Sequence, residues 1–435
     1  MGLKYLNHII RFSLVAFIAL SFYLSYLIWV SPARSEDNTG PEVSQNLVDK
    51  RSEKELFLPT SLSFYDDKKL YVTNSQELLL HLHQKMKKQE IRRLQWYDFD
   101  NEELLNKSLV KTDYISFDYF APMKLNQYLN VYQLQLSEKD KSRLKTAYFD
   151  EMRVNILQKQ LVFINHETHQ VIKFHIQMDV SALTKYLLKH KKQMNSYDGQ
   201  TLLVSGQVYS HQPIQLQLYS YISTAQPYTL FRDAFFGDIR DIKVNDDTKD
   251  ELVLSNHQGD MLTIYLNSQL IEFRANQVDF HNKNMYQVSA DYISRLGTNL
   301  GQLRFFNRDA QGIVYRSFVE GYPLFRKDEN GELHVHFGEL SQDNTRNMEI
   351  RGSLNTIQVP IPSEKTVKLP GGLTIYEKLQ AAGLKEIPEM TIGYLWVDIQ
   401  DTGVVDLTPT WFVHYENTWV SFDELMNELL QKKGA

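Results

Sequence analysis

Residues 303–319, LRFFNRDAQGIVYRSFV, indicate the type of fold most directly. Two runs rich in aromatic and β-branched residues flank the polar stretch NRDAQG, a pattern typical of two antiparallel strands joined by a turn. Residues 161–174 (LVFINHETHQVIKF) have the same pattern, and residues 331–337 (GELHVHF) and 393–407 (GYLWVDIQDTGVVDL) continue it. The sheets of this protein are therefore predicted to be mainly antiparallel.

Helices are predicted between these strands. Apolar residues recur at helical spacing in four segments: QELLLHLHQKMKKQEIRR after Ser75, EKDKSRLKTAYF after Ser137, VSALTKYLLKHKKQMN from Val180, and FDELMNELLQKK after Ser421. Ser421 and Glu424 have the spacing of a capping box. Helices and antiparallel strands in mixed order predict an α+β fold rather than a doubly wound parallel sheet.

A membrane segment is predicted near the N-terminus. Residues 12–30 (FSLVAFIALSFYLSYLIWV) carry no charge, and a helix of that length spans a hydrocarbon core of about 30 Å. Lys4 and Arg11 precede this run, so the positive-inside rule places residues 1–11 in the cytoplasm and the chain after Pro32 outside. The sequence thus predicts a single-pass protein of the cell membrane with extracytoplasmic domains.

A cleaved signal peptide is the alternative, because Ser31 and Ala33 are small residues that suit a cleavage after Ala33. The apolar run is longer than the signal-peptide core of about 7–15 residues, and it ends near Trp29. We therefore expect a retained anchor.

One face of the predicted helix is a candidate contact with a partner helix. Ser21 and Ser25 are four residues apart, a small-xxx-small arrangement that lets another helix approach closely. The alternative is that each hydroxyl bonds back to its own helix. The candidate partner-helix contacts are Phe17, Ser21, Leu24, Ser25 and Ile28.

The rest of the chain is predicted to form a tether and three α+β domains. Residues 31–60 are polar and lack periodicity, as a tether would. The domains are placed at residues 61–200, 201–345 and 346–435. Helices around Tyr292 and Tyr376 are each followed by a hairpin and then by an aromatic string with a proline, which predicts that the last two domains are similar to each other. Chance similarity of hairpins is the alternative.

Composition excludes several classes of function. The 435 residues include no cysteine, which excludes disulfides, a thiol nucleophile, Cys-ligated zinc, iron–sulfur clusters and an acylated lipoprotein anchor. The net charge of −6 gives no overall basic field, so no nucleic-acid partner is predicted.

Histidine motifs do not reach the pattern of a metal site. The run HETH from His166 to His169 is one residue short of a zincin motif and lies in a predicted turn. His334 and His336 share a strand face, but no third ligand accompanies them. Phosphate-binding loops and the nucleophile elbow are absent as well. We therefore predict no catalytic, metal or cofactor-binding residues, and a protein that is not an enzyme.

A basic run lies in the first predicted helix. Lys85, Lys87, Lys88, Arg92 and Arg93 follow one another within nine residues. Such a run is usually a solvated face. The alternative is contact with an anionic wall polymer or with lipid headgroups.

Several strings together resemble the YycH family of Gram-positive bacteria. They are residues 321–326 (GYPLFR), 331–336 (GELHVH), 359–362 (VPIP), 369–373 (LPGGL), 392–394 (IGY) and 407–415 (LTPTWFVHY). The resemblance implies three extracytoplasmic α+β domains behind one membrane helix, and a regulator that uses no cofactor. It also implies two partners in the membrane, the sensor histidine kinase of the WalKR (YycFG) two-component system and a YycI-like protein, with an effect on cell-wall metabolism.

Two other functions stay open at this point. One is an extracytoplasmic cell-wall hydrolase, which would show paired carboxylates about 5–10 Å apart in a deep pocket. The other is a wall-polymer binding module, which would show basic helix faces along a groove with exposed Tyr or Trp.

Overall fold

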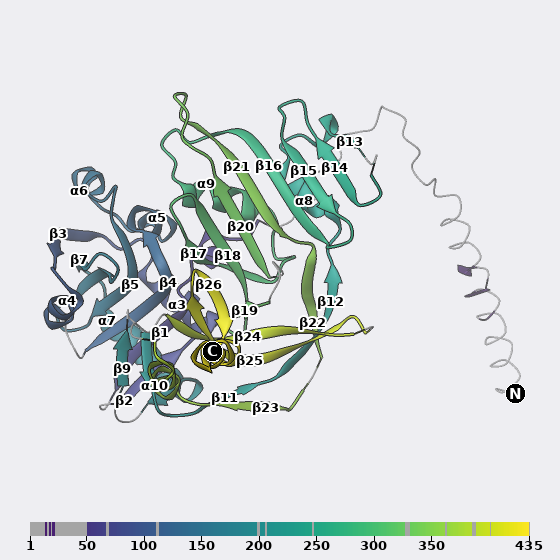
Figure 1. The fold of residues 1–435 in the computed structure, drawn as a ribbon. Coiled ribbons are helices and arrows are strands. Elements are labelled where there is room, and N and C mark those ends of the chain that lie inside the picture. The colour runs from purple at the N-terminus through teal and green to yellow at the C-terminus, as the bar shows by residue number, and fades with distance from the viewer. Residues whose placement is uncertain are drawn as a thin grey trace, which may run out of the picture. The chain divides into compact units, whose positions relative to one another are not determined.

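The computed structural model describes residues 14, 17, 18, 20, 21, 50–66, 69–109, 113–197, 201–204, 207–245, 248–326, 331–361, 363–384, 389–400 and 402–434 (Figure 1). The chain divides into two compact units, Met1–Leu47 and Val48–Ala435. Leu14, Phe17, Ile18, Leu20 and Ser21 of the first unit are helical and exposed.

The predicted membrane span falls mostly outside the described residues. Within the described part of the chain, no helix is long and apolar enough to cross a bilayer. The span over residues 12–30 therefore stays a prediction.

The N-terminal half of the second unit contains an antiparallel sheet. Its strands, in spatial order among the described residues, are β3 (Ile91–Asp98), β7 (Gln170–Ile176), β6 (Gln160–Asn165), β5 (Tyr148–Asn155), β4 (Tyr114–Lys124), β1 (Ser61–Asp66), β2 (Lys69–Thr73) and β8 (Asn195–Tyr197). β6 shows why the central strands are almost continuously apolar. Leu161 and Phe163 point into the main core, whereas Val162 and Ile164 pack with Leu105 of a helix on the other face.

A second, larger sheet forms the rest of the unit. Its main path in the described residues runs β13 (Lys243–Asn245), β14 (Glu251–Ser255), β15 (Met261–Tyr265), β16 (Leu270–Asp279), β21 (Thr345–Ser353), β20 (Glu332–Phe337), β18 (Gly312–Val319), β19 (Tyr322–Phe325), β24 (Met390–Ile399), β25 (Val404–Tyr415), β12 (Tyr219–Ala225) and β22 (Asn355–Ile361). β17 (Gln302–Arg308) pairs with β18, and β26 (Thr418–Ser421) pairs with β25. Two short pairs are separate: β9 (Thr201–Val204) with β10 (Gln207–Ser210), and β11 (Ile214–Gln217) with β23 (Thr366–Leu369).

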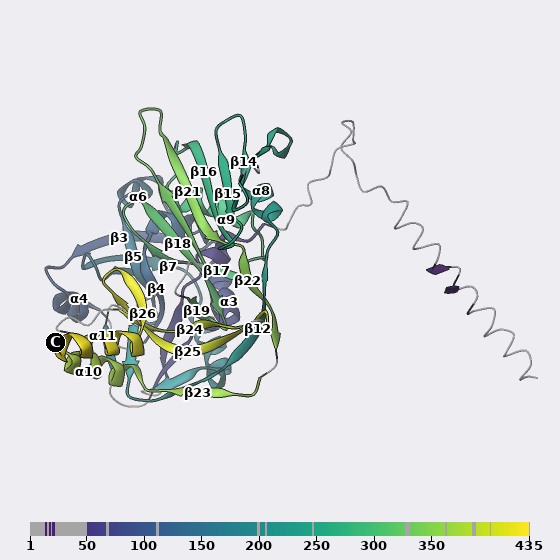
Figure 2. The same cartoon turned by 45° about the vertical axis from the view of Figure 1, so that its right-hand side comes forward.

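The helices lie between and beside these sheets. They are α2 (Glu53–Leu56), α3 (Gln76–Met86), α4 (Glu102–Ser108), α5 (Leu125–Val131), α6 (Glu138–Arg143), α7 (Val180–His190), α8 (Tyr228–Phe235), α9 (Met285–Ser294), α10 (Gly372–Ala382) and α11 (Phe422–Gly434), with the 3₁₀ turns η1 (Lys191–Gln193) and η2 (Ile239–Asp241). α10 and α11 lie side by side near the C-terminus, as Figure 2 shows, and pack together through Leu379 and Leu425.

The α+β class and the mainly antiparallel pairing are confirmed. The predicted hairpins at 161–174 and 303–319 are β6–β7 and β17–β18, and residues 393–407 fall in β24–β25. The β19–β24 pair is parallel. The domain limits near residues 200 and 345 stay predictions.

Two predicted helices are shorter than expected. α3 ends at Met86, because Lys88 takes a φ of 61° and its N–H bonds to the carbonyl oxygen of Tyr132, at 3.3 Å. Arg92 and Arg93 consequently belong to β3. Similarly, α6 ends at Arg143, and the residues from Tyr148 onward form β5.

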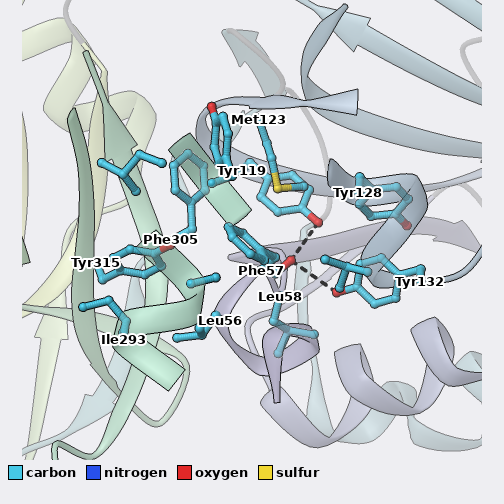
Figure 3. Packing of buried hydrophobic residues seen from close by; sticks show 14 of the residues in the cluster. Leu56, Phe57, Leu58, Tyr119, Met123, Tyr128, Tyr132, Ile293, Phe305 and Tyr315 are labelled. Atoms are coloured by element: carbon cyan, nitrogen blue, oxygen red, sulfur yellow. Dashed lines mark hydrogen bonds between the residues drawn. The ribbon is translucent and has the colours of Figure 1, made fainter. Parts of the chain in front are cut away.

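Residues 51–60 fold with the second unit, whereas the sequence placed them in the tether. Leu56, Phe57 and Leu58 have no exposed surface. The Phe57 ring lies 6.2–6.3 Å, centroid to centroid, from the rings of Tyr286, Phe305 and Tyr315 (Figure 3). A short apolar cluster in a polar stretch thus becomes the centre of the core.

We predict that Phe57→Ala lowers the free energy of unfolding by about 3–5 kcal/mol, because it leaves a cavity where no neighbour can collapse without breaking aromatic contacts. Urea denaturation of the full chain in detergent micelles measures this change. Leu157→Ala is the control, since Leu157 is 79% exposed, and it should change the value by less than about 0.5 kcal/mol. A Phe57→Ala effect equal to that of the control would contradict the packing described.

Candidate functional site

The predicted partner-helix face is only partly within the described residues. Phe17 and Ser21 are helical, and Phe17 is 69% exposed. Leu24, Ser25 and Ile28 lie outside the described residues. The contact face therefore stays a prediction.

Part of the stretch that the sequence placed in the tether is instead held at a specific place in the second unit. We call residues 51–58 the joint segment. The Arg51 N–H bonds to the carbonyl oxygen of Ser294 at 2.9 Å, and its side chain donates to the carbonyls of Gly297, at 3.0 Å, and Gly301. The backbone N–H of Arg51 thus bonds to the last residue of α9, and its guanidinium holds the turns that follow the helix. Burial lowers the pKa of Arg51.

Phe57 links the two large sheets. Its ring contacts α9, β17 and β18 on the side of the second sheet, while its carbonyl oxygen accepts hydrogen bonds from the hydroxyls of Tyr119, at 3.1 Å, and Tyr132, at 3.2 Å (Figure 3). Tyr119 lies on β4 of the first sheet, and Tyr132 follows α5. Residues 51–58 are therefore a wedge between the two halves of the unit.

Further contacts close the same joint. Tyr286 and Arg308 both donate to the carbonyl oxygen of Pro122, at 3.0 and 2.9 Å. The rings of Phe120 and Phe306 are 4.9 Å apart. Arg304, which is 1% exposed, donates to the Pro59 carbonyl and to the Gln76 side chain, and its guanidinium lies over the ring of Phe318. Burial lowers the pKa of Arg304 to about 10.

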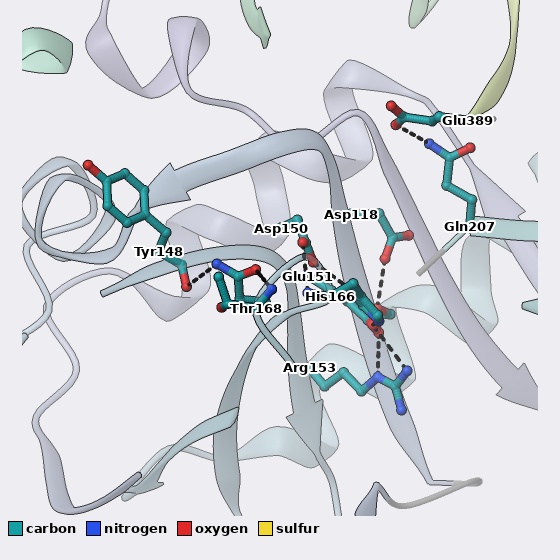
Figure 4. A network of polar contacts seen from close by, with 11 residues as sticks. Asp118, Tyr148, Asp150, Glu151, Arg153, His166, Thr168, Gln207 and Glu389 are labelled. Atoms are coloured by element: carbon teal, nitrogen blue, oxygen red, sulfur yellow. Dashed lines mark hydrogen bonds and ion pairs between the residues drawn. The ribbon is translucent and has the colours of Figure 1, made fainter. Parts of the chain in front are cut away.

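A buried network of charged side chains lies in the first sheet (Figure 4). Arg153 makes two hydrogen bonds to the carboxylate of Glu151 on the same strand. His166 lies between two carboxylates, with Nδ1 2.6 Å from Asp150 and Nε2 3.3 Å from Glu151. The acidic neighbours outweigh burial and raise the pKa of His166 to about 9. The imidazolium and the guanidinium together neutralise Asp150 and Glu151.

Asp118 is left without a cation of its own in this network. The Ser61 hydroxyl donates to it at 2.9 Å, and Ser116 lies 3.0 Å from Asp118 but only 2.6 Å from Glu151. Because Ser116 has one proton to donate and Glu151 is nearer, a protonated Asp118 can in turn donate to the Ser116 oxygen. Burial, followed by the charge of Glu151, raises the pKa of Asp118 to about 7.

A second neutral carboxyl group approaches from the second sheet. Glu389 accepts a hydrogen bond from Gln207 at 3.2 Å, and its burial, with the charge of Asp150, raises its pKa to about 8 (Figure 4). The charge of the network thus depends on pH in the neutral range.

A small cavity of about 100 Å³ lies next to the network. It is lined by residues of both sheets, among them Asn74, Tyr197, Tyr322 and Trp411. Among the described residues that line it, Asp118 is the one carboxylate. The paired carboxylates that a cell-wall hydrolase would need in its pocket are therefore not found in this cavity.

The histidine motifs have structural roles. His166 belongs to the buried network, and His169 takes a left-handed φ of 55° in the β6–β7 turn. His334 bonds to Glu332 at 2.9 Å. No group of three or more His, Asp or Glu side chains among the described residues could hold a metal ion.

Three of the strings quoted above, residues 321–326, 369–373 and 392–394, contain glycines at close contacts. A side chain at Gly321, which has a φ of +82°, would meet the carbonyl oxygen of Asn74 at 2.0 Å. One at Gly393 would meet the ring of Phe325 at 2.5 Å. Residue identity in these strings is therefore set by packing between elements.

Comparison with known proteins was made on both sequence and structure. The sequence profile of the YycH protein, C-terminal domain, matches residues 206–433, which is more than half of the chain. The chain belongs to the YycH family. This membership supports a role in regulation of the YycG (WalK) system in general.

The fold agrees with that assignment. The crystal structure of YycH from Bacillus subtilis superposes with a TM-score of 0.65, and the match covers 86% of this chain and 97% of that one at 11% sequence identity. At this identity the likeness establishes the fold alone. No curated protein sequence matches the chain.

Sequence reasoning on this YycH-family chain missed the joint segment and the buried network. A signal for the network was present, because Asp150, Glu151 and Arg153 interrupt a strongly apolar strand. The signal for the joint segment was weaker, because Leu56, Phe57 and Leu58 are three consecutive apolar residues that show neither helical nor strand periodicity.

We predict that Asp118→Asn stabilises the protein increasingly as pH rises from about 4 to 7. The pKa of Asp118 is about 7 in the folded protein and about 3.9 in the unfolded chain, so ionisation of the wild-type carboxyl disfavours folding over this range. Thermal unfolding between pH 4.5 and 8 measures the difference. Exposed Asp343→Asn is the control and should leave the pH profile of the melting temperature unchanged. A constant difference between wild type and Asp118→Asn would refute a neutral Asp118.

Proposed function

We propose that this chain is a membrane-anchored accessory regulator of a WalK/YycG-type sensor histidine kinase. It acts together with a YycI-like protein, and its output is control of cell-wall metabolism. Family membership carries this proposal, and the predicted anchor at residues 12–30 gives it a route to the membrane domain of the kinase. The kinase and the YycI-like protein are its partners in the membrane.

The joint segment suggests how the exterior is coupled to the anchor. Arg51, in the stretch that the sequence placed in the tether, is clamped to the end of α9, and six residues later Phe57 lies between the two sheets. A partner or ligand that favours one arrangement of the sheets would therefore act on the segment that continues into the anchor. A shift in the anchor would then favour one of two kinase states, with a coupling of about 1–3 kcal/mol.

The mechanism needs surfaces and bistable packing but no reactive groups. The joint is built of aromatic rings and of hydrogen bonds to carbonyls, and a close-packed interface of this kind shifts between discrete arrangements rather than deforming continuously. The adjoining charged network is internally paired, apart from Asp118 and Glu389. These features favour a regulator over the hydrolase alternative.

We predict that Ser21→Leu reduces the amount of kinase that co-purifies with the full chain from membranes. A leucine fills the space that a small residue leaves for a partner helix. Quantitative mass spectrometry of the purified complex measures the recovery, and a loss of at least fivefold is expected.

Ala19→Leu is the matched control. On an ideal helix, residue 19 lies about 160° from both residue 17 and residue 21, so this change adds bulk on the opposite face. It should leave recovery unchanged. If wild-type protein recovers neither the kinase nor a YycI-like protein, the proposed function is wrong; if both variants lose the kinase equally, the predicted face is wrong but the function stands.

A further inference from the structure

Three lysines gather where α2 and the end of α3 meet. Lys54 lies on α2, Lys87 caps α3 and Lys88 follows it. The contact with Lys87 is the largest cause that lowers the pKa of Lys54, followed by burial and by the charges of Lys87 and Lys88. Within the described part of the chain, none of the three ammonium groups has a carboxylate partner within 4.0 Å. Such crowding of like charges disfavours the fold unless an anion neutralises it.

α3 and α7 meet at His81, close to the basic end of α3. His81 stacks on the ring of Tyr186 with centroids 3.9 Å apart, and Tyr186 in turn contacts His190. Burial, and then the charges of Lys85 and His190, lower the pKa of His81. The lowered pKa leaves His81 neutral at neutral pH, so the positive charge at this end of α3 comes from its lysines.

One of these three lysines, Lys88, lines an open cleft of about 590 Å³. Lys141 lines it as well, together with Asn130, Gln133 and Gln135, whose side chains end in amides. The Lys141 ammonium lies 2.7 Å from Glu138, whose side chain is 87% exposed. Ammonium and amide N–H groups are the donors that bind phosphate oxygens. The cleft thus combines charge and directional donors in one concave site.

Charge is distributed unevenly along the chain, and the excess of positive charge lies in the part that contains the cleft. Residues 61–200 hold 21 Lys and Arg against 17 Asp and Glu, whereas residues 201–435 hold 20 against 30. The part of the protein that contains the cleft is thus net positive, and the remainder is strongly acidic. A polyanion would be steered to the basic part and repelled elsewhere.

We propose that this cleft binds consecutive phosphate groups of a phosphodiester polymer, neutralised by Lys88 in its wall and by Lys54 and Lys87 beside Lys88, and hydrogen-bonded by the amides of Asn130, Gln133 and Gln135. A concave site suits a chain that can enter it, whereas the headgroups of a bilayer form a plane. This binding goes beyond the proposed regulation of a kinase and does not depend on it.

The test uses the full chain in nanodiscs of phosphatidylcholine, with a glycerol phosphate oligomer as the probe. Isothermal titration calorimetry at low salt gives the affinity, because screening weakens such contacts at high salt. The variant K54Q/K87Q/K88Q should bind at least tenfold more weakly than wild type. Without the probe, its melting temperature should equal or exceed that of wild type, since the repulsion is removed, and this shows that it is folded.

The control is K243Q/K365Q/K368Q, which removes the same charge from exposed lysines of the acidic part and should change the affinity less than twofold. A second readout is acetylation by an amine reagent, which the oligomer should slow at Lys54, Lys87 and Lys88. No binding, or an equal loss of affinity in both triple variants, overturns the proposal. Protection that appears only in nanodiscs containing equal parts of phosphatidylcholine and phosphatidylglycerol, and not with the oligomer, overturns it in favour of a membrane surface.

Discussion

The position of Phe57 is the constraint on which the rest of the structure depends. Its ring packs on Tyr286, Phe305 and Tyr315, and its carbonyl oxygen is held by hydroxyls from the other side of the joint. One residue therefore satisfies apolar packing toward one sheet and hydrogen bonding toward the other. Because it lies six residues after Arg51, the same contact fixes where the chain leaves the folded unit. The stability of the unit and the point at which the chain enters it therefore have a common origin in this wedge.

The buried charged network adds a second constraint of a different kind. Arg153 and His166 compensate the carboxylates of Glu151 and Asp150, so these ions remain buried as a satisfied group. At the acidic end of the neutral range Asp118 is protonated and therefore neutral. The network favours the folded state more strongly there than at higher pH, where the buried carboxyl ionises. The network lies beside the joint. The residues that take up a proton are therefore neighbours of the residues that pack between the sheets.

The elements that could be predicted are those whose pattern lies in their own stretch of sequence. The β17–β18 hairpin and α7 follow from the period of their own apolar residues, and the regulator family follows from strings such as residues 407–415. The joint segment could not be predicted, because Phe57 is buried by residues more than 200 positions away. The strand assignment of Arg92 and Arg93 was missed for a related reason, since a bond from Lys88 to Tyr132 ends α3. At the candidate partner face, Phe17 and Ser21 are exposed on a helix, and what they contact remains a prediction.

The central claim is that the joint segment is part of the structural core and opens only when the sheets separate. Native-state hydrogen exchange of the full chain tests it at the amides of Arg51 and Phe57 in the joint segment, which bond to the carbonyls of Ser294 and Glu53, and at the amide of Thr60 just after it, which bonds to Asp118. The account predicts that these amides exchange with the same opening free energy as those of β4 and β17. Exchange at the joint segment through a low-energy local opening, while both sheets stay protected, would contradict it.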